Sequence, residues 1–518
     1  MHHSLLINEI TSLIFEELDS STLASIAGTC RAFTDPALDV LWRSQIDIGP
    51  LIRVMPGDLW TIVLLADAPV LYKRTKIIKF TRSLDESDWS RFEYYGRRIH
   101  KLAHPLESSP IGTFVVHEDV FVALSAYRPI RTFLPNLREL SLDLGYPYVT
   151  KHVPFFQCML GPGLRRLSIF SNPRTGTSLS QLLLSISRTS HAIQSLDLVL
   201  QAYGSSEDIA ALRRFLCSQR DLHHVDVKCV IPIPMSIPTE AISHLARLPC
   251  LNSWRSAAVS LGTEHQFSTM RGGRFASLQH FSFIAASWDS AAKVMSGMRL
   301  SLISLSITVG CQTRPALDIH DSFQDFLESF VGHSALASLS DFRLTGEFHI
   351  PDDFETKRST FEALQTILFS LTSSLRHLSL CVDGLVSQFN DIWLSQAAIR
   401  WPALQVLQLK GFGSPNITLE GLIPLLRYCP QLEDLDVSPL LRPFPSRLLR
   451  GIGCNTRITD LIVQVGIENP VSVFRCLVLM FPNIQRIRLS YYYSSQREDF
   501  GAYLTLDRLL AESIECAA

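Results

Sequence analysis

Apolar residues near the start of the chain recur at helical spacing in three consecutive runs. These positions are Leu6, Ile10, Ile14 and Leu18, then Leu23, Ile26 and Cys30, then Leu38, Leu41 and Trp42. The spacing predicts three short helices. We expect Ser20 or Ser21 to cap the second helix, and Asp35 followed by Pro36 to begin the third. Helices of about ten residues cannot bury all of these side chains among themselves, so part of the apolar surface is expected to face a partner.

Farther along, the pattern Leu-x-x-Leu-x-Leu recurs about every 29 residues, a period similar to that of leucine-rich repeats. The copies begin at Leu137, Leu164, Ile193, Leu222, Leu278, Leu302, Leu375, Leu404, Leu432, Ile458 and Ile484, with weaker copies at Leu251 and Leu339 and an irregular one at Arg98. Successive side chains of a strand face opposite sides. The last two apolar residues of each copy are therefore expected to be buried, and the residues between them exposed.

Helical patterns fill the intervals between these copies, and proline precedes several of them, as in Leu134-Pro135, Trp401-Pro402 and Cys429-Pro430. Proline ends a helix and favours an extended approach to the next strand. Strand, helix and proline turn in repetition predict an α/β fold, a leucine-rich-repeat solenoid shaped as a horseshoe. A helix over 506–516 is expected to cap its end.

The N-terminal stretch resembles the F-box, the adaptor-binding module of substrate receptors in cullin-type ubiquitin ligases. The likeness lies in the Cys30-Arg31-x-Phe33 and Leu41-Trp42 signatures, although Ile7-Asn8 stand where the family usually has Leu-Pro. The resemblance implies three helices that contact a Skp-type adaptor. The adaptor-binding residues it implies are Leu6, Glu9, Ile10, Ile14, Leu18, Leu23, Ile26, Cys30, Phe33, Leu41 and Trp42. The alternative is an ordinary helical cap on a larger domain.

The expected domains are an F-box at 1–46, a connecting region and solenoid cap at 47–97, leucine-rich repeats at 98–490 and a C-terminal cap at 491–518. No Gly/Ser-rich or charged tether follows the F-box-like stretch, so we expect rigid docking. We expect loops and one or two helices over 45–72. The basic segment 72–82 is expected to be a solvated strand edge, with a phosphate-binding patch as the alternative.

The composition of the chain argues against several classes of function. The chain has 518 residues and a net charge of -2, which argues against nucleic acid or an acidic membrane as the main partner. Its 11 cysteines show no zinc spacing, which suits reduced thiols in the cytoplasm or nucleus. No apolar run is long enough to span a membrane.

No catalytic constellation occurs in the sequence. Phosphate-loop, nucleophile-elbow and zinc-protease motifs are missing. His223 and His224 are adjacent on a predicted strand and face opposite sides, so solvent or peptide contact is favoured over a shared metal ion. We therefore expect a non-catalytic protein without a cofactor or metal.

Alternation along the repeat strands predicts an exposed wall with mixed charge. Its candidate substrate-binding residues are Arg166, His224, His280, His377, Lys410, Asp434, Asp436, Arg486 and Arg488. The resemblance implies a receptor that binds a Skp-type adaptor, and through it a cullin, while the repeats hold a target protein of unknown identity. Two alternatives remain open: a protein-binding scaffold with no role in ubiquitin transfer, and a receptor for a small molecule.

Overall fold

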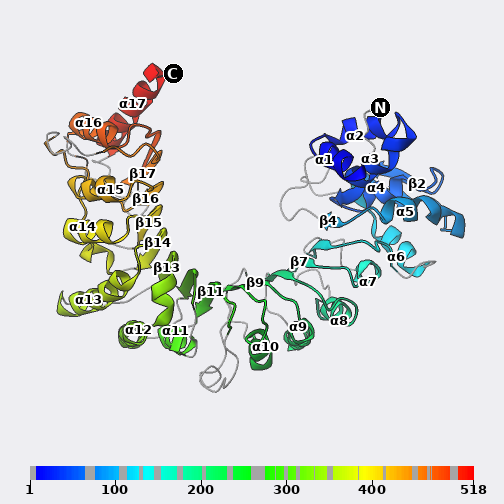
Figure 1. Ribbon diagram of the computed structural model, residues 1–518, viewed down its shortest axis with the longest axis horizontal. Coiled ribbons are helices and arrows are strands. Elements are labelled where there is room, and N and C mark those ends of the chain that lie inside the picture. Colours follow the sequence, from blue (N-terminus) through cyan, green and yellow to red (C-terminus); the bar gives the residue numbers. More distant parts are fainter. Residues whose placement is uncertain are drawn as a thin grey trace. The chain divides into compact units, whose positions relative to one another are not determined.

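The computed structural model forms two compact units, Met1–Leu251 and Asn252–Ala518 (Figure 1). The residues that the structure describes are 7–64, 76–103, 114–127, 132–144, 153–171, 179–200, 206–229, 237–257, 275–285, 287–296, 301–310, 316–331, 333–346, 354–382, 384–411, 416–445, 453–463, 467, 469–489 and 500–517.

The first three elements are helices, as the apolar spacing predicts: α1 (Asn8–Glu16), α2 (Ser20–Ala27) and α3 (Arg31–Arg43). The prediction that Ser20 or Ser21 caps α2 is wrong. The cap is Asp19, whose Oδ1 accepts from the amides of Ser21 and Thr22 at 2.9 and 3.0 Å. Bonds from the Ser21 and Thr22 hydroxyls and amides also hold the pKa of Asp19 well below its usual value.

The third helix begins earlier than predicted. Its N-cap is Cys30, and Pro36 lies inside the helix rather than at its first position. The hydroxyl of Thr34 donates to the Ala27 carbonyl at 2.9 Å and so ties the first turn of α3 to the end of α2. This contact helps to fix the start of α3 ahead of the proline, despite the backbone bond that proline removes.

The first unit continues through alternating strands and helices. Their bounds are β1 (Ser44–Gln45), α4 (Gly49–Arg53), β2 (Trp60–Leu64), β3 (Lys76–Phe80), η3 (Glu86–Asp88), α5 (Trp89–Gly96), β4 (Lys101–Ala103), β5 (Phe114–Val116), α6 (Glu118–Ala126), β6 (Glu139–Asp143), α7 (Val153–Met159), β7 (Arg166–Ser171), α8 (Leu179–Thr189), β8 (Ser195–Leu200), α9 (Ser206–Ser218), β9 (His224–Cys229) and α10 (Thr239–Leu245). One parallel sheet has the order β1-β4-β6-β7-β8-β9, and a smaller sheet has the order β2-β3-β5.

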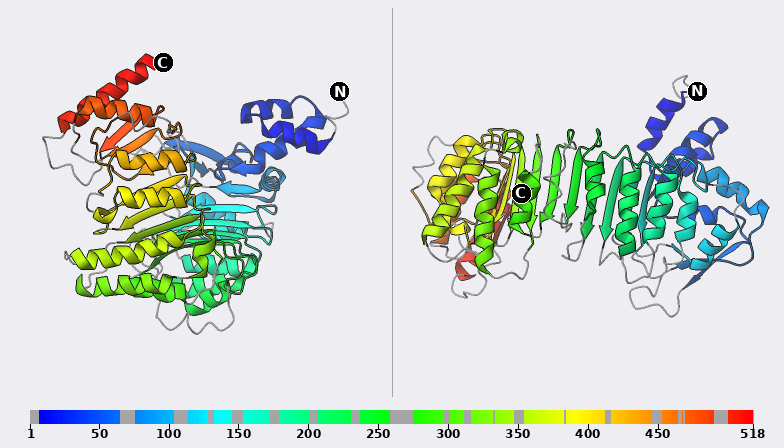
Figure 2. Two further views of the ribbon diagram at one scale, coloured as in Figure 1. Left: turned by 60° about the vertical axis from the view of Figure 1, so that its left-hand side comes forward. Right: turned by 90° about the horizontal axis from the view of Figure 1, so that it is seen from below.

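The second unit carries the parallel strands β10 to β18 in chain order. Its elements are β10 (Ser253–Ala257), β11 (His280–Ala285), α11 (Trp288–Ser296), β12 (Ser304–Val309), α12 (Ala316–Phe330), η5 (Ser334–Ser338), β13 (Asp341–Gly346), α13 (Phe354–Ser370), β14 (His377–Val382), η6 (Val386–Gln388), α14 (Asp391–Arg400), β15 (Val406–Lys410), η7 (Glu420–Leu422), α15 (Ile423–Tyr428), β16 (Asp434–Asp436), β17 (Asp460–Val463), α16 (Pro470–Met480), β18 (Arg486–Leu489) and α17 (Phe500–Ala517). In each unit the repeat helices lie along one face of the sheet (Figure 2).

The predicted repeat is confirmed. From β6 to β18, each strand of the long parallel sheets begins two residues after the first position of a copy of the motif. Burial alternates as expected, so that in β8 Leu196 and Leu198 are buried while Ser195 and Asp197 are partly exposed. Within each unit, neighbouring strands pair in register, so that equivalent leucines stack in the core. The fold is therefore of the leucine-rich-repeat type.

The proline turns form as predicted. The amide of Leu404 donates to the Trp401 carbonyl at 3.1 Å, and the amide of Leu432 donates to the Cys429 carbonyl at 3.2 Å. Each proline occupies the second position of such a turn, where its fixed φ is favourable. The end of one helix is thereby joined to the next strand in the same way from repeat to repeat.

Part of the connecting region differs from expectation. The segment expected to hold loops and helices contains α4 but also the strand β2. The basic segment does form a strand, yet β3 lies between β2 and β5 rather than at an edge, and Ile77 and Ile78 are buried. The remainder of that basic segment, 72–75, lies outside the described residues.

A ladder of buried and partly buried polar side chains joins consecutive repeats of the first unit. The Ser190 hydroxyl donates to the Gly161 carbonyl at 2.9 Å, and the Gln219 amide donates to the Ser190 carbonyl at 2.9 Å. A ring nitrogen of His244 then contacts the Gln219 carbonyl at 2.7 Å. Each turn thus satisfies a buried carbonyl of the turn before it, which would otherwise cost about 1–3 kcal/mol.

Candidate partner-binding surfaces

Helices α1 to α3 form a small module around a core of their own. Phe15, Leu23 and Ala37 are buried at its centre. The partly buried residues packed against them are Leu18, Ile26, Ala27, Phe33, Val40 and Leu41. The rings of Phe15 and Phe33 meet edge to face with centroids 5.8 Å apart, and Arg43 pairs with Glu16.

One side of α1 leaves apolar residues in solvent. Ile7, just before the helix, and Ile10, Leu13 and Ile14 are exposed, and Leu13 retains 65% of its accessible surface. At 100° per residue, three of these positions, 7, 10 and 14, fall within about 60° of one another around the helix axis. Full burial of such a side chain contributes about 1.5–3 kcal/mol, so a partner that covered this α1 face would gain substantial free energy.

Helix α3 anchors the module to the rest of the first unit. The rings of Trp42 on α3 and Tyr95 on α5 lie 4.5 Å apart between centroids, and Trp42 is only 8% exposed. The buried guanidinium of Arg98 donates to the carboxylates of Asp35 and Asp39 on α3. The chain then enters the parallel sheet directly, since β1 pairs with β4. These contacts agree with the expected absence of a flexible tether.

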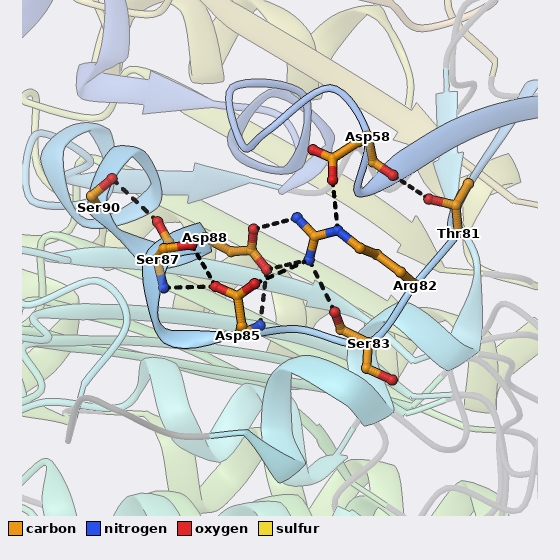
Figure 3. Close-up of polar contacts among 8 residues, drawn as sticks. All are labelled: Asp58, Thr81, Arg82, Ser83, Asp85, Ser87, Asp88 and Ser90. Carbon is orange, nitrogen blue, oxygen red and sulfur yellow. Dashed lines mark hydrogen bonds and ion pairs between the residues drawn. The ribbon is translucent and has the colours of Figure 1, made fainter.

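An arginine-centred cluster holds α5 in place for this contact (Figure 3). Nη1 and Nη2 of Arg82 donate to the two carboxylate oxygens of Asp88 at 2.8 and 2.7 Å, and Nε donates to Asp58 at 2.7 Å. Asp88 is fully buried, and the bonds from Arg82 lower its pKa. A bidentate pair of this kind fixes geometry strongly, so the cluster positions the start of α5.

The wall of the first unit is the sheet face opposite its repeat helices. Lys101, Glu139 and Arg166 occupy register-matched positions on β4, β6 and β7. Both cations contact the Glu139 carboxylate, at 3.5 Å from Lys101 and 3.0 Å from Arg166. His224 is partly exposed on β9. Arg166 thus shares one carboxylate with Lys101, and His224 is the other predicted wall residue of this unit.

The wall of the second unit also pairs most of its charges. Asp434 accepts from Gln408 at 2.8 Å, while Asp436 contacts Lys410 at 3.3 Å. Asp436 is only 6% exposed, and burial raises its pKa. The expectation that Asp436 presents a carboxylate to a partner is therefore wrong, because the side chain lies below the surface and is already paired.

The remaining predicted wall residues lie on the same face. Arg486 and Arg488 share the Asp460 carboxylate, at 2.8 and 3.4 Å. His377 contacts Asp341, and His280 is exposed. The predicted cations thus lie on the surface, but most of them contact acidic side chains of the wall.

The predicted adaptor-binding residues separate into three groups. Glu9, Ile10 and Ile14 are exposed, and Leu18, Ile26, Cys30, Phe33 and Leu41 are partly exposed. Leu23 and Trp42 are buried within this chain, so the expectation that they offer apolar surface to a partner is wrong. Leu6 lies outside the described residues.

Two exposed residues of the α1 face were not among the predicted positions. Leu13 lies three residues after Ile10, and Ile7 lies three residues before it. The same helical spacing that selected Ile10 and Ile14 includes both, so the signal was present in the sequence.

Comparison with known proteins adds little to this picture. No family model and no curated protein matches the chain. Among solved structures, the crystal structure of the leucine-rich repeat-containing protein LegL7 from Legionella pneumophila is similar over 71% of this chain and 97% of that chain, at 13% sequence identity and a TM-score of 0.29. The assignment of the repeat fold rests on the strand register and burial described above.

Metal-binding clusters and membrane-spanning helices are both absent from the described part of the chain. No group of three or more His, Cys, Asp or Glu residues there is arranged to hold a metal ion. Its helices include none with the length and apolar character needed to cross a bilayer.

Proposed function

We propose that this chain is the substrate-recognition subunit of a cullin-type ubiquitin ligase. In this proposal α1 to α3 act as an F-box that binds a Skp-type adaptor, and the repeat walls bind the target protein. The observation that carries it is the exposed apolar α1 face on a module otherwise anchored to a leucine-rich-repeat sheet. The chain would act without catalysis, in the cytoplasm or nucleus, by raising the effective concentration of target near a conjugating enzyme.

The contacts of α3 support this role. A receptor of this kind has to hold its target at a fixed distance from the adaptor. The Trp42–Tyr95 ring contact and the Arg98 ion pairs join the module to the repeats, so motion of the adaptor would be transmitted to the first unit.

Co-purification of the full-length chain with a Skp-type adaptor tests the proposal. The wild type should retain the adaptor, and the Ile10→Asp, Leu13→Asp double variant should lose it, because charge on the α1 face opposes its burial. Ile392→Asp is the matched control, since Ile392 on α14 is 71% exposed and far from α1 in the sequence. Adaptor absent from the wild-type sample, or retained equally by the double variant, would refute the proposal.

A second candidate function is a protein-binding scaffold with no role in ubiquitin transfer. The burial of Trp42 against Tyr95 favours it, because a helical cap on the repeats would make the same contact. Target binding without any adaptor binding would support this second function.

A further inference from the structure

Four side chains of the second unit form a compact polar group on its wall. Ser306 on β12 is the register partner of Arg343 on β13, and Thr308 is the partner of Thr345. Alternate residues Leu305, Ile307, Phe342 and Leu344 are buried, so all four polar side chains face the same side. Ser306, Thr308, Arg343 and Thr345 are named the Arg343 patch.

Arg343 differs from the other cations described on this wall. Lys410 is paired with Asp436, and Arg486 and Arg488 with Asp460. Arg343 is exposed and makes no side-chain hydrogen bond or ion pair within the described part of the unit. The hydroxyls of Ser306, Thr308 and Thr345 likewise form no bond there.

The nearest acid on the same strand does not neutralise Arg343. Asp341 lies two residues earlier on the same face, but its carboxylate accepts from the Ser340 hydroxyl and contacts the His377 ring. Ser379, the register partner of Arg343 on β14, donates its hydroxyl to Gln408 at 3.2 Å. Neither Asp341 nor Ser379 therefore pairs with the Arg343 guanidinium.

The dimensions of this patch suit an oxyanion. Neighbouring strands are about 4.8 Å apart, and same-face residues of one strand are about 6.6 Å apart. A guanidinium offers a planar fork of donors that matches a carboxylate or phosphate, and each hydroxyl supplies one further donor.

We propose that the Arg343 patch binds an oxyanion, a carboxylate or a phosphate, on the peptide chain of the protein that the second unit recognises. Charge complementarity assigns the anion to the partner, since the patch holds an unpaired cation and no acid. That this partner is a ligase target rests on the proposed function, but anion binding itself does not.

Binding of the full-length chain to an array of random-sequence peptides tests the proposal. Each peptide is made in three versions, with serine, glutamate or phosphoserine at its centre. We expect the anionic versions to bind about tenfold or more tightly than the serine version, with added salt weakening the difference. Preference for glutamate or for phosphoserine tells which oxyanion is bound.

Arg343→Gln should abolish the preference for anionic peptides, and Thr345→Val should reduce it. Arg427→Gln is the matched control, because Arg427 is an exposed arginine on α15. Equal binding of the three versions, or an unchanged preference in Arg343→Gln, would overturn the proposal. If the anion preference holds but no adaptor co-purifies, only the proposed ligase role fails. If the adaptor co-purifies but the peptides show no anion preference, only the proposed oxyanion site fails.

Discussion

The guanidinium of Arg98 donates to the carboxylate of Asp39 and so joins the turn before the first repeat strand to α3. The arginine is 7% exposed at its side chain, whereas Asp39 keeps about half of its surface in solvent. An ion pair with one buried partner is screened less by salt than a surface pair. This contact therefore contributes to holding the helical module against the repeats.

Arg98→Gln should lower the free energy of unfolding by about 2 kcal/mol, the scale of a hydrogen bond to a charged group. Arg91→Gln, an exposed arginine on α5, should change it by less than about 0.5 kcal/mol. Chemical denaturation of the two variants measures this. Equal effects would show that Arg98 does not anchor α3.

Trp42→Ala should destabilise the chain by about 3–5 kcal/mol, because it empties a buried space between α3 and Tyr95. Tyr127→Ala, at an exposed aromatic residue, should cost less than about 0.5 kcal/mol. The unfolding temperatures of the two variants, measured by thermal denaturation, test this difference. A Trp42→Ala protein as stable as the wild type would mean that this side chain faces outward.

Gln219→Leu should cost about 2–4 kcal/mol, since it leaves the Ser190 carbonyl and the Ile193 amide without buried partners. Gln194→Leu, at an exposed position just before β8, makes the same chemical change without that loss. The test is the difference between their denaturation midpoints. Similar midpoints would rule out a stabilising role for the ladder.

Asp436→Asn should stabilise the chain at pH 7. Burial raises the pKa of Asp436 in the folded state, so its protonated form is favoured below the unfolded value of 3.8 and that benefit is lost as pH rises through the folded pKa. The advantage of the neutral amide should therefore shrink toward acid pH. Thermal unfolding across this range, beside the control Asp325→Asn at an exposed position on α12, checks the sign. A destabilised Asp436→Asn protein at pH 7 would contradict it.

The repeat strands could be predicted because their buried residues recur in a local pattern. The alternation of Leu196 and Leu198 with polar residues predicts a strand even when no other repeat is considered. The role of Gln219 could not be predicted, since its partners belong to turns nearly thirty residues away. The sequence around a polar residue does not tell whether its side chain will contact solvent or a buried carbonyl group.

The helical module shows the same limit. Spacing identifies Ile14 and Trp42 as apolar positions on helices, but does not tell whether each packs on this chain or on another. Tyr95 and Arg98 decide that question for α3, and neither lies in the module. Arg343 was missed for a related reason, because its significance comes from the pairing of the other wall charges.

Hydrogen–deuterium exchange of the full-length chain, with and without a purified Skp-type adaptor, tests the central claim most directly. Binding should slow the exchange of amides in α1 and leave those of β14 and β15 unchanged. No change at α1 when the adaptor is present in excess, or protection on the repeat strands instead, would contradict the assignment of the α1 face as the adaptor-binding surface.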